Sequence, residues 1–342
     1  MILLVKVSSI LYTELTKVII SKGVFTMSAK TVVMNGDRMN YDHRLDYSIL
    51  SDEVKVYEES EPSQILERIQ GFDIVVTKEM PVSGDIIRQF PDTVKLIVEA
   101  GTGYNNIDLD AAREKGITVC NIPAYSTERV AHTAIMMIMN LSSSMRKQIA
   151  MLHDKDHTNF TKCMQVDHVE INGKTLGVIG AGNIGREVIK VAQALGMKIL
   201  AYNVPTMEDE PGIHFASLEE VLSQSDYVTL HCPLMPATRH IINKERLALM
   251  KPTAFIVNTA RGPLIDEAAL IEALQEGRIA GAGLDVQEVE PPSEDNPLYY
   301  MDNVILTPHM GWRGLETRQR LVSIVADDIK NFLAGTPINV VS

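Results

Sequence analysis

Short apolar runs alternate with helical patterns along most of this chain. In the first half, we expect strands at 31–35, 54–57, 73–77, 95–99 and 118–121. Helical segments are expected between these strands, at 63–70, 84–90 and 109–115. Such alternation indicates a parallel sheet with helices wound on its faces.

The same alternation resumes in the second half of the chain. Strands are expected there at 176–179, 198–202, 227–231, 254–258, 281–286 and 304–307. A long helix at about 128–145 joins the halves, and a last helix is expected at 316–333. The pattern therefore predicts an α/β protein with two doubly wound parallel-sheet domains.

The joining helix is apolar on nearly every side, with residues such as Val130, Ile135, Met137 and Leu141. A helix that is apolar all round must be buried on all sides. Packing between the domains would bury it, and so would a subunit interface. We expect a homodimer.

The first 25 residues are apolar in part, but Lys6, Glu14 and Lys17 interrupt the apolar stretches. This pattern fits neither a signal peptide nor a membrane span. We expect the fold to begin near Met27, with residues 1–26 as an extension outside it.

Composition narrows the function classes. The 342 residues carry a net charge of −12, which argues against nucleic acid and anionic membrane surfaces as partners. Cys120, Cys163 and Cys232 are widely separated and are expected to be buried thiols in the reducing environment of the cytoplasm. No cluster has metal-ligand spacing, so we expect no metal.

One motif points to a cofactor. An apolar strand at 176–179 runs into a turn with Gly180, Gly182 and Gly185, and an amphipathic helix begins at once behind it. This spacing gives a tight turn, a close backbone approach to a pyrophosphate, and a helix packed closely on the strand. The helix N-terminus supplies amide donors to the phosphates. The segment predicts a dinucleotide site.

Three polar residues follow strands at the edge where ligands of doubly wound sheets bind. Arg261 follows the strand at 254–258, Glu290 the strand at 281–286, and His309 the strand at 304–307. Together they suit the reduction of a 2-keto acid. Arg261 would hold the substrate carboxylate through a two-pronged contact. His309 would donate the proton to the carbonyl oxygen, and Glu290 would stabilise the imidazolium.

These motifs resemble the D-isomer-specific 2-hydroxyacid dehydrogenase family over residues 31–340, with matching segments at 101–108, 174–188, 257–262, 284–291 and 307–309. The resemblance implies that Arg261, Glu290 and His309 form the catalytic set. It also implies a Rossmann cofactor domain at 127–310. A flavodoxin-like substrate domain would consist of residues 27–126 and 311–342.

The resemblance implies binding residues as well. The 101–103 loop would offer backbone amides to the substrate carboxylate, Thr259 and Asp285 would lie near the nicotinamide, and Cys232 and Pro233 would border the adenine. The implied cofactor-binding residues are Gly180, Gly182, Asn183, Ile184, Gly185, Asn203, Cys232, Pro233, Thr259, Ala260, Asp285, His309 and Gly311. The substrate-binding residues would be Lys78, Gly101, Thr102, Gly103, Arg261 and Trp312, with Lys78 reaching the substrate from the opposite domain.

Segments 102–108 and 309–321 are similar to the glycerate dehydrogenase (hydroxypyruvate reductase) branch. This implies a short 2-keto acid, hydroxypyruvate or glyoxylate, as substrate. A larger or apolar 2-keto acid stays open, and so does a non-enzymatic NAD(H)-sensing protein similar to a corepressor. Trp312 would either wall the substrate pocket or pack in the core.

One position departs from the pattern of NAD enzymes. The residue after the strand at 198–202, usually acidic where it binds the adenosine ribose, is Asn203. An amide does not repel a 2′-phosphate, but Glu208, Asp209 and Glu210 follow shortly after. This acidic run disfavours NADP, and we expect NAD as the cofactor.

Overall fold

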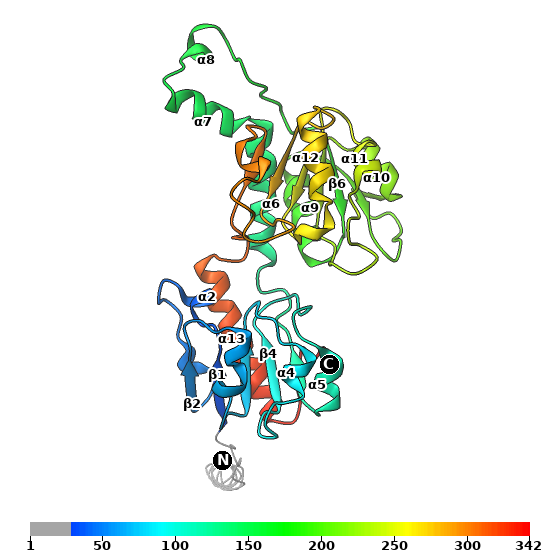
Figure 1. Ribbon diagram of the computed structural model, residues 1–342. Coiled ribbons are helices and arrows are strands. Elements are labelled where there is room, and N and C mark those ends of the chain that lie inside the picture. Colours follow the sequence, from blue (N-terminus) through cyan, green and yellow to red (C-terminus); the bar gives the residue numbers. More distant parts are fainter. Residues whose placement is uncertain (1–28) are drawn as a thin grey trace, which may run out of the picture. The chain divides into compact units, whose positions relative to one another are not determined.

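The computed structural model describes residues 29–342, which form two compact units (Figure 1). The first unit extends to Ile122 and includes Val322–Ser342, and the second is Pro123–Leu321. The expected extension at residues 1–26 lies outside the described residues. Within residues 29–342, no helix is long and apolar enough to cross a membrane.

The first unit is built on a five-stranded parallel sheet with the order β2-β1-β3-β4-β5. This is the strand order of flavodoxin-like folds. The strands are β1 Lys30–Val33, β2 Glu53–Val56, β3 Ile74–Thr77, β4 Leu96–Glu99 and β5 Thr118–Cys120. The helices are α2 Asp37–Asn40, α3 Ile65–Arg68, α4 Gly84–Ile87, α5 Leu109–Glu114 and the part of α13 (Leu315–Leu333) from Val322 onward. Short 3-10 helices lie at η1 Tyr47–Ile49 and η2 Pro62–Gln64.

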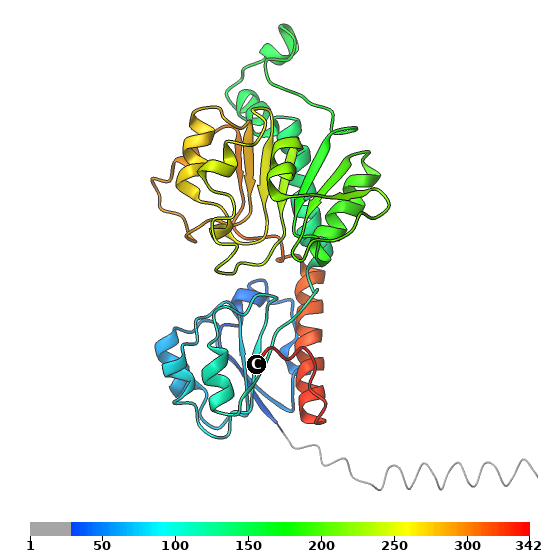
Figure 2. The same cartoon turned by 90° about the vertical axis from the view of Figure 1, so that its right-hand side faces the viewer.

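Both faces of this sheet are covered, as a parallel sheet requires. Val32, Val75 and Ile97 point to one face, where they form a core with Ile65 of α3 and Ile87 of α4. The C-terminal part of α13 lies on the opposite face from α4 and α5 (Figure 2). Side chains of β3 and β4 are buried on both faces, which explains why these strands are continuous apolar runs in the sequence.

The second unit is built on a seven-stranded parallel sheet with the order β12-β11-β10-β9-β6-β7-β8. The strand order reverses beside β6, as in Rossmann folds. The strands are β6 Thr175–Ile179, β7 Lys198–Tyr202, β8 Ile213–Phe215, β9 Tyr227–Leu230, β10 Phe255–Asn258, β11 Gly281–Leu284 and β12 Val304–Leu306. The two parallel sheets confirm the predicted fold class.

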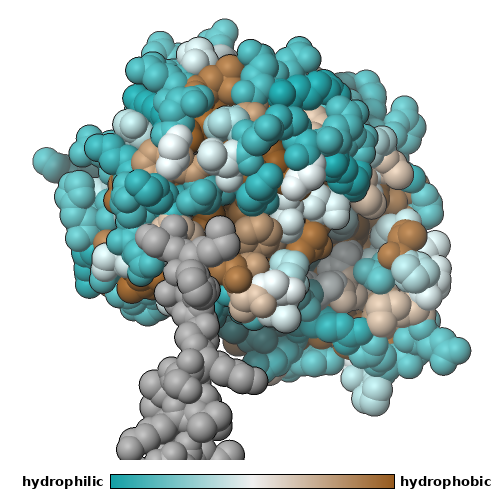
Figure 3. Space-filling model, turned by 90° about the horizontal axis from the view of Figure 1, so that it is seen from below, coloured by the Kyte–Doolittle hydropathy of each residue, from teal (hydrophilic) through white to brown (hydrophobic). Residues whose placement is uncertain are grey.

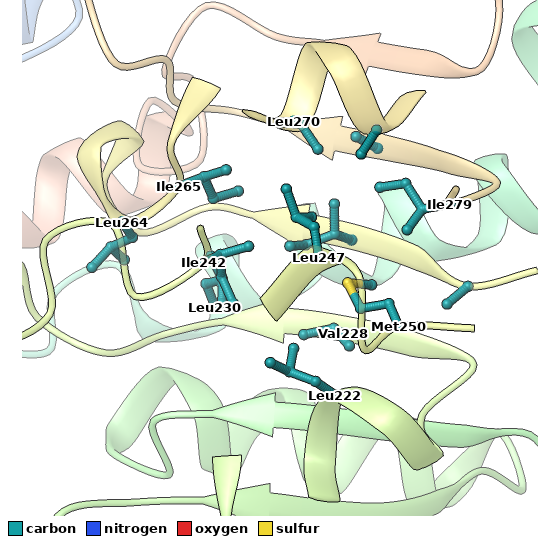
Figure 4. Packing of buried hydrophobic residues seen from close by; sticks show 14 of the residues in the cluster. Leu222, Val228, Leu230, Ile242, Leu247, Met250, Leu264, Ile265, Leu270 and Ile279 are labelled. Carbon is teal, nitrogen blue, oxygen red and sulfur yellow. The ribbon is translucent and has the colours of Figure 1, made fainter. Parts of the chain in front are cut away.

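Helices cover both faces of the second sheet. The helices of this unit are α6 Thr127–Ser142, α7 Met145–His153, α8 Thr158–Thr161, α9 Asn183–Ala194, α10 Leu218–Gln224, α11 Lys244–Leu247 and α12 Glu267–Gln275, with 3-10 helices η3 Gly262–Leu264 and η4 Pro297–Tyr300. All of them except α7 and α8 lie on the unit's main body (Figure 1). Figure 4 shows the core on one face, where Leu222 of α10, Leu247 of α11 and Leu270 of α12 meet Val228 and Leu230 of β9. This packing holds the carboxyl ends of β9 to β12 in place.

The prediction of one continuous helix at 128–145 is wrong at its C-terminal end. The helix α6 stops at Ser142, and Ser144 adopts a left-handed conformation with φ 47° before α7 begins. Within the second unit, α6 packs against α9 and the strands β10 to β12. Met137 is fully buried there, whereas Met139 is 48% exposed. Burial on all sides therefore does not extend to every apolar residue of this helix.

Several further elements were not predicted, among them the strand β8 and the helices α7 and α8. The strand β8 has only three residues, and its middle residue His214 is exposed. Its apolar pattern is therefore too short to predict a strand from the sequence. The segment with α7 and α8 forms an arm that projects from the second unit (Figure 1).

The face in Figure 3 carries mostly hydrophilic residues with smaller hydrophobic areas between them, as is usual for globular proteins.

Candidate active site

The glycine turn lies between β6 and α9, as the motif predicts. Gly180 has φ 99°, and a Cβ atom there would lie 2.5 Å from the backbone nitrogen of Cys232. A Cβ atom at Gly185 would lie 2.1 Å from the carbonyl oxygen of Gly180, so this glycine lets α9 approach the strand. Both positions require glycine because of the protein's own backbone.

Gly182 differs from the other two glycines. It is the N-cap of α9, makes no side-chain cap, and has no atom within 4 Å of the place where a Cβ would lie. The described chain therefore leaves free space beside Gly182 at the N-terminus of α9. This cradle fits a pyrophosphate, which would accept hydrogen bonds from the first amides of the helix. Asn183 and Ile184 form the first turn of the same helix.

Asn203 lies directly after β7, beside the glycine turn. Its side-chain oxygen accepts a hydrogen bond of 3.0 Å from the backbone nitrogen of Ala181. Its side-chain nitrogen donates to the carbonyl oxygen of Pro205 at 3.4 Å. The amide thus connects the end of β7 to the glycine turn, a structural role that the sequence did not reveal.

The carboxyl ends of β9 and β10 carry two buried polar atoms for which the described residues provide no partner, His231 Nδ1 and Thr259 Oγ1. The other ring nitrogen of His231 lies 2.9 Å from Thr229 Oγ1. Burial lowers the pKa of His231 to about 3, so the ring is neutral. Burial also raises the pKa of the neighbouring Cys232 thiol to about 11. The prediction of buried thiols holds for Cys120, but it is wrong for Cys163, which is exposed, and Cys232 is only partly buried. Unsatisfied buried atoms at this edge fit the binding of a polar cofactor.

Arg261 is held in an extended conformation directly after the turn that ends β10. The side chain of Asn258 donates to the carbonyl oxygen of Arg261 at 2.9 Å and accepts from the nitrogen of Ala260 at 3.0 Å. A Cβ atom at Gly262 would lie 1.8 Å from the carbonyl oxygen of Gln287. The loop with Arg261 therefore contacts the loop that leads to Glu290.

His309 and Glu290 form the predicted pair. Nδ1 of His309 lies 2.9 Å from Oε2 of Glu290, and Oε1 of Glu290 accepts a hydrogen bond of 3.0 Å from the nitrogen of Gln287. The side chains are 23% and 35% exposed, respectively. The contact uses one ring nitrogen of His309 and leaves Nε2 for a substrate. Such a histidine–carboxylate pair suits proton transfer.

Asp285 fixes the turn that carries His309. Its carboxylate accepts hydrogen bonds from Thr307 Oγ1 at 2.5 Å and from the nitrogens of Met310 and Gly311 at 2.8 Å each. The nitrogen of His309 donates to the carbonyl oxygen of Asp285 at 2.8 Å. This turn gives His309 a φ of 49°. The resemblance marked Asp285 and Gly311 only as cofactor neighbours and did not predict this role.

A second set of contacts missed by the sequence joins the loops of Arg261 and Glu290. The nitrogen of Glu267 donates to Oε2 of Glu288 at 3.3 Å, and the nitrogen of Glu288 donates to Oε2 of Glu267 at 3.1 Å. His240 Nε2 lies 2.7 Å from Oε1 of Glu288. These reciprocal contacts tie together the loops that carry Arg261 and Glu290. No motif signals them, because each acidic residue taken alone resembles a solvated one.

The family follows from comparison with known proteins. Residues 135–311 match the model of the NAD binding domain of the D-isomer specific 2-hydroxyacid dehydrogenases. The chain belongs to this family. It is 40% identical to the hydroxypyruvate reductase of Blautia hydrogenotrophica over 323 residues, which cover 92% of this chain and 99% of the relative. The glycerate dehydrogenase of Methylorubrum extorquens is 39% identical, with the same shares covered.

Among solved structures, a glyoxylate reductase from Paecilomyes thermophila superposes with a TM-score of 0.79 at 31% identity, covering 92% of this chain and 98% of that one. This 2-hydroxyacid dehydrogenase is therefore an oxidoreductase with an NAD-binding domain. Among its described residues, no group of His, Cys, Asp and Glu side chains has the arrangement of a metal site.

The first unit of the dehydrogenase contains the loop predicted to bind the substrate. Ile122 fixes it twice, because its nitrogen donates to the carbonyl oxygen of Gly101 at 2.9 Å and its carbonyl oxygen accepts from Thr102 Oγ1 at 3.0 Å. Gly103 is half-buried. A Cβ atom at Gly101 would lie 3.3 Å from Nζ of Lys78. The loop is thus rigidly held beside a lysine ammonium group.

Lys78 is only 2% exposed, and its ammonium group lies 2.7 Å from a carboxylate oxygen of Glu79. Glu99, which was not predicted, is fully buried below the loop and accepts hydrogen bonds from Thr77 Oγ1 at 2.7 Å and Asn106 Nδ2 at 2.9 Å. Burial raises the pKa of Glu99, although Lys78 opposes this shift. Lys78 therefore lies in a buried polar cluster at the carboxyl edge of the sheet.

In the second unit, Trp312 is 5% exposed, and the guanidinium group of Arg313 lies over its ring, 5.8 Å from the centroid. This burial agrees with the core-packing interpretation. Its contact with a substrate stays a prediction, as do those of Lys78 and the 101–103 loop.

Proposed function

We propose that this dehydrogenase reduces hydroxypyruvate, and also glyoxylate, to the D-2-hydroxy acid with NADH and catalyses the reverse oxidation. The observation that carries the proposal is the pair of His309 and Glu290, whose side chains lie 2.9 Å apart. This pair and Arg261 follow strands of the same sheet at its carboxyl edge. The relatives named for hydroxypyruvate, glycerate and glyoxylate support the choice of substrate.

In this mechanism, bound NADH supplies the hydride that reduces the carbonyl carbon. His309 is protonated at the start and donates the proton from Nε2 to the carbonyl oxygen. Glu290 keeps the proton on Nδ1 and so orients the ring for donation. Arg261 pairs with the substrate carboxylate, because a guanidinium group matches its two oxygens. In alcohol oxidation, His309 begins neutral and accepts the proton.

The proposal divides the binding residues between the units. The domain at 127–310 would bind the cofactor, and the domain at 27–126 and 311–342 would bind the substrate. The 101–103 loop would donate backbone hydrogen bonds to the substrate carboxylate, with Lys78 and Trp312 as further contacts. The open cradle at Gly182 and the unsatisfied atoms of His231 and Thr259 support binding of the dinucleotide. NAD is proposed as the cofactor in preference to NADP.

A substrate panel tests the proposal. Purified protein is mixed with NADH and, in turn, hydroxypyruvate, glyoxylate, pyruvate and a branched 2-keto acid, and the panel is repeated with NADPH. We expect the highest kcat/KM with hydroxypyruvate and NADH. Oxidation of D-glycerate but not L-glycerate checks the stereochemistry. Turnover of the branched acid alone would refute hydroxypyruvate and glyoxylate as the substrates. NADH binding without turnover of any acid would favour a sensing role.

We also propose a homodimer formed through the arm at 145–169. On this arm, Ile149 is 60% exposed, Leu152 51% and Phe160 77%. No residue of α7 is buried by the described chain. Exposed apolar side chains gathered on a projecting segment are typical of a protein interface, and a second copy offers the same side chains in return.

Light scattering on the purified protein tests the dimer. We expect the mass of two chains for the wild type and of one chain for the double variant Ile149→Ser, Phe160→Ser. Leu333→Ser removes a similarly exposed side chain outside the arm and is the control. A wild-type mass of one chain would refute the dimer. The proposal places the enzyme in the cytosol, since Cys120, Cys163 and Cys232 are all free thiols.

A further inference from the structure

Arg186 and Glu210 form a two-pronged ion pair beside the glycine turn. Arg186 belongs to the first part of α9, and its terminal nitrogens lie 2.9 and 2.7 Å from the two carboxylate oxygens of Glu210. The same guanidinium group is 3.9 Å from the sulfur of Met207. A parallel pair of this kind fixes the planar group in one orientation. The side chains are 42% and 34% exposed, so solvent reaches both.

The pair borders the position that distinguishes the two nicotinamide cofactors in Rossmann domains. The residue after the second strand binds the ribose 2′-hydroxyl when it is acidic, and an arginine nearby accommodates a 2′-phosphate. In this chain the residue is the neutral Asn203, whose oxygen is bonded to the nitrogen of Ala181. Arg186 contacts Met207, in the loop that begins at Asn203. A suitable cation is thus present near the site, but Glu210 neutralises it.

Backbone contacts hold Glu210 in place. Its nitrogen donates to the carbonyl oxygen of Ile213 at 3.1 Å, and the nitrogen of Ile213 donates back at 2.9 Å. The neighbouring Asp209 is engaged elsewhere, with the nitrogen of Phe215 and the ring of His214 at 2.7 Å each. Of the acidic run at 208–210, Glu210 is the residue bonded to Arg186.

We infer that Glu210 sets the cofactor preference of this dehydrogenase. It occupies the guanidinium group that would otherwise bind a 2′-phosphate, and it adds a negative charge that repels this phosphate. Glu210 thereby replaces the acidic residue that NAD enzymes usually have at the position of Asn203. The inference rests on the dinucleotide site of the proposed function. The hydrogen bond between the partners lowers the pKa of Glu210 and raises that of Arg186, which keeps both charged.

Direct binding measurements test the inference without relying on turnover. The dissociation constants of NADH and NADPH are measured by nucleotide fluorescence for the wild type, Glu210→Gln, Glu208→Gln and the double variant Glu210→Gln, Arg186→Gln. Glu208 lies in the same loop and is exposed, so its variant removes the same charge without touching the ion pair. Thermal unfolding checks that each variant is folded.

We expect the wild type to bind NADH more tightly than NADPH. Glu210→Gln should strengthen NADPH binding relative to NADH by about tenfold, as expected for one gained charge-assisted contact. Glu208→Gln should leave the ratio unchanged, and the double variant should lose the gain. An unchanged ratio in Glu210→Gln overturns the inference, and an equal effect of Glu208→Gln shows a general loop charge instead. If the wild type binds neither nucleotide, the proposed function itself fails.

Discussion

Two glycines of the turn between β6 and α9 have opposite surroundings and give a matched pair of variants. Gly182→Ala places a methyl group where no atom lies within 4 Å, whereas Gly185→Ala places one 2.1 Å from the carbonyl oxygen of Gly180. Gly182 has a φ of −79°, which alanine adopts without strain. If Gly182 serves the cofactor and Gly185 serves the fold, the two variants must fail in different assays.

The surroundings of the two glycines allow the loss of stability in Gly185→Ala and the loss of NADH affinity in Gly182→Ala to be estimated. Gly185→Ala forces α9 away from β6, and overpacking of this kind costs about 1–3 kcal/mol. For a domain of this size, that lowers Tm by roughly 2–12 °C. Gly182→Ala exchanges glycine for alanine at an N-cap, for less than about 1 kcal/mol. Its methyl group would displace a pyrophosphate bound to the helix amides, and loss of one charged hydrogen bond would weaken NADH binding ~10–150-fold.

Thermal unfolding without nucleotide and NADH fluorescence titration measure the two effects separately. We expect Gly182→Ala to melt near the wild type and to bind NADH poorly. Gly185→Ala should melt clearly lower. Wild-type affinity for NADH in Gly182→Ala would refute the placement of the pyrophosphate at this helix N-terminus. A wild-type Tm in Gly185→Ala would refute the close packing of α9 on the strand.

Three further predictions concern proton transfer, loop support and pH. Replacing His309 by alanine should lower kcat by roughly 10²–10⁴-fold, because it removes the proposed proton donor. The Kd for NADH should stay unchanged, and near-full turnover would show that another group donates the proton. Glu288→Gln keeps the side-chain shape but weakens the contacts to Glu267 and His240, so we expect a lower kcat/KM for hydroxypyruvate and little change in NADH affinity. The control is Glu276→Gln, which lies outside this cluster and should have less effect on kcat/KM. Equal effects of the two variants would argue against support of the loops by Glu288. Burial raises the pKa of Asp328 to about 6, although Asn339 donates a hydrogen bond to its carboxylate. The folded state therefore binds the proton of the Asp328 carboxyl group more tightly than the unfolded state does. The contribution of this protonation to the free energy of unfolding is lost as pH rises through about 6. Asp328→Asn should consequently gain stability in urea unfolding at pH 8 relative to pH 5, and an equal effect at both pH values would contradict this sign.

The sequence was sufficient to predict an architecture of two parallel sheets, because strands that are buried on both faces appear in it as apolar runs. It placed every strand except β8, whose short Ile213–Phe215 segment includes an exposed histidine. It missed the break between α6 and α7, since hydrophobicity does not report the left-handed backbone of Ser144. The order of the strands within each sheet came from the structure.

The candidate site divides in the same way. Arg261, Glu290 and His309 were found from the sequence because each lies in the loop after a predicted strand and the carboxyl ends of parallel strands meet at one edge. Their side-chain chemistry suggested their roles, and the family resemblance implied the same catalytic set. The structure then places Nδ1 of His309 2.9 Å from Oε2 of Glu290, a distance that no sequence pattern predicts.

The supporting contacts were decided by tertiary structure alone. Asp285 fixes the turn of His309, Glu267 and Glu288 tie together the loops of Arg261 and Glu290, and Glu210 holds Arg186. Each contact joins segments that are separated along the chain, and only the folded backbone brings them within hydrogen-bond distance. Local patterns determine which segments form strands and helices, and sheet order and loop packing determine which polar side chains meet.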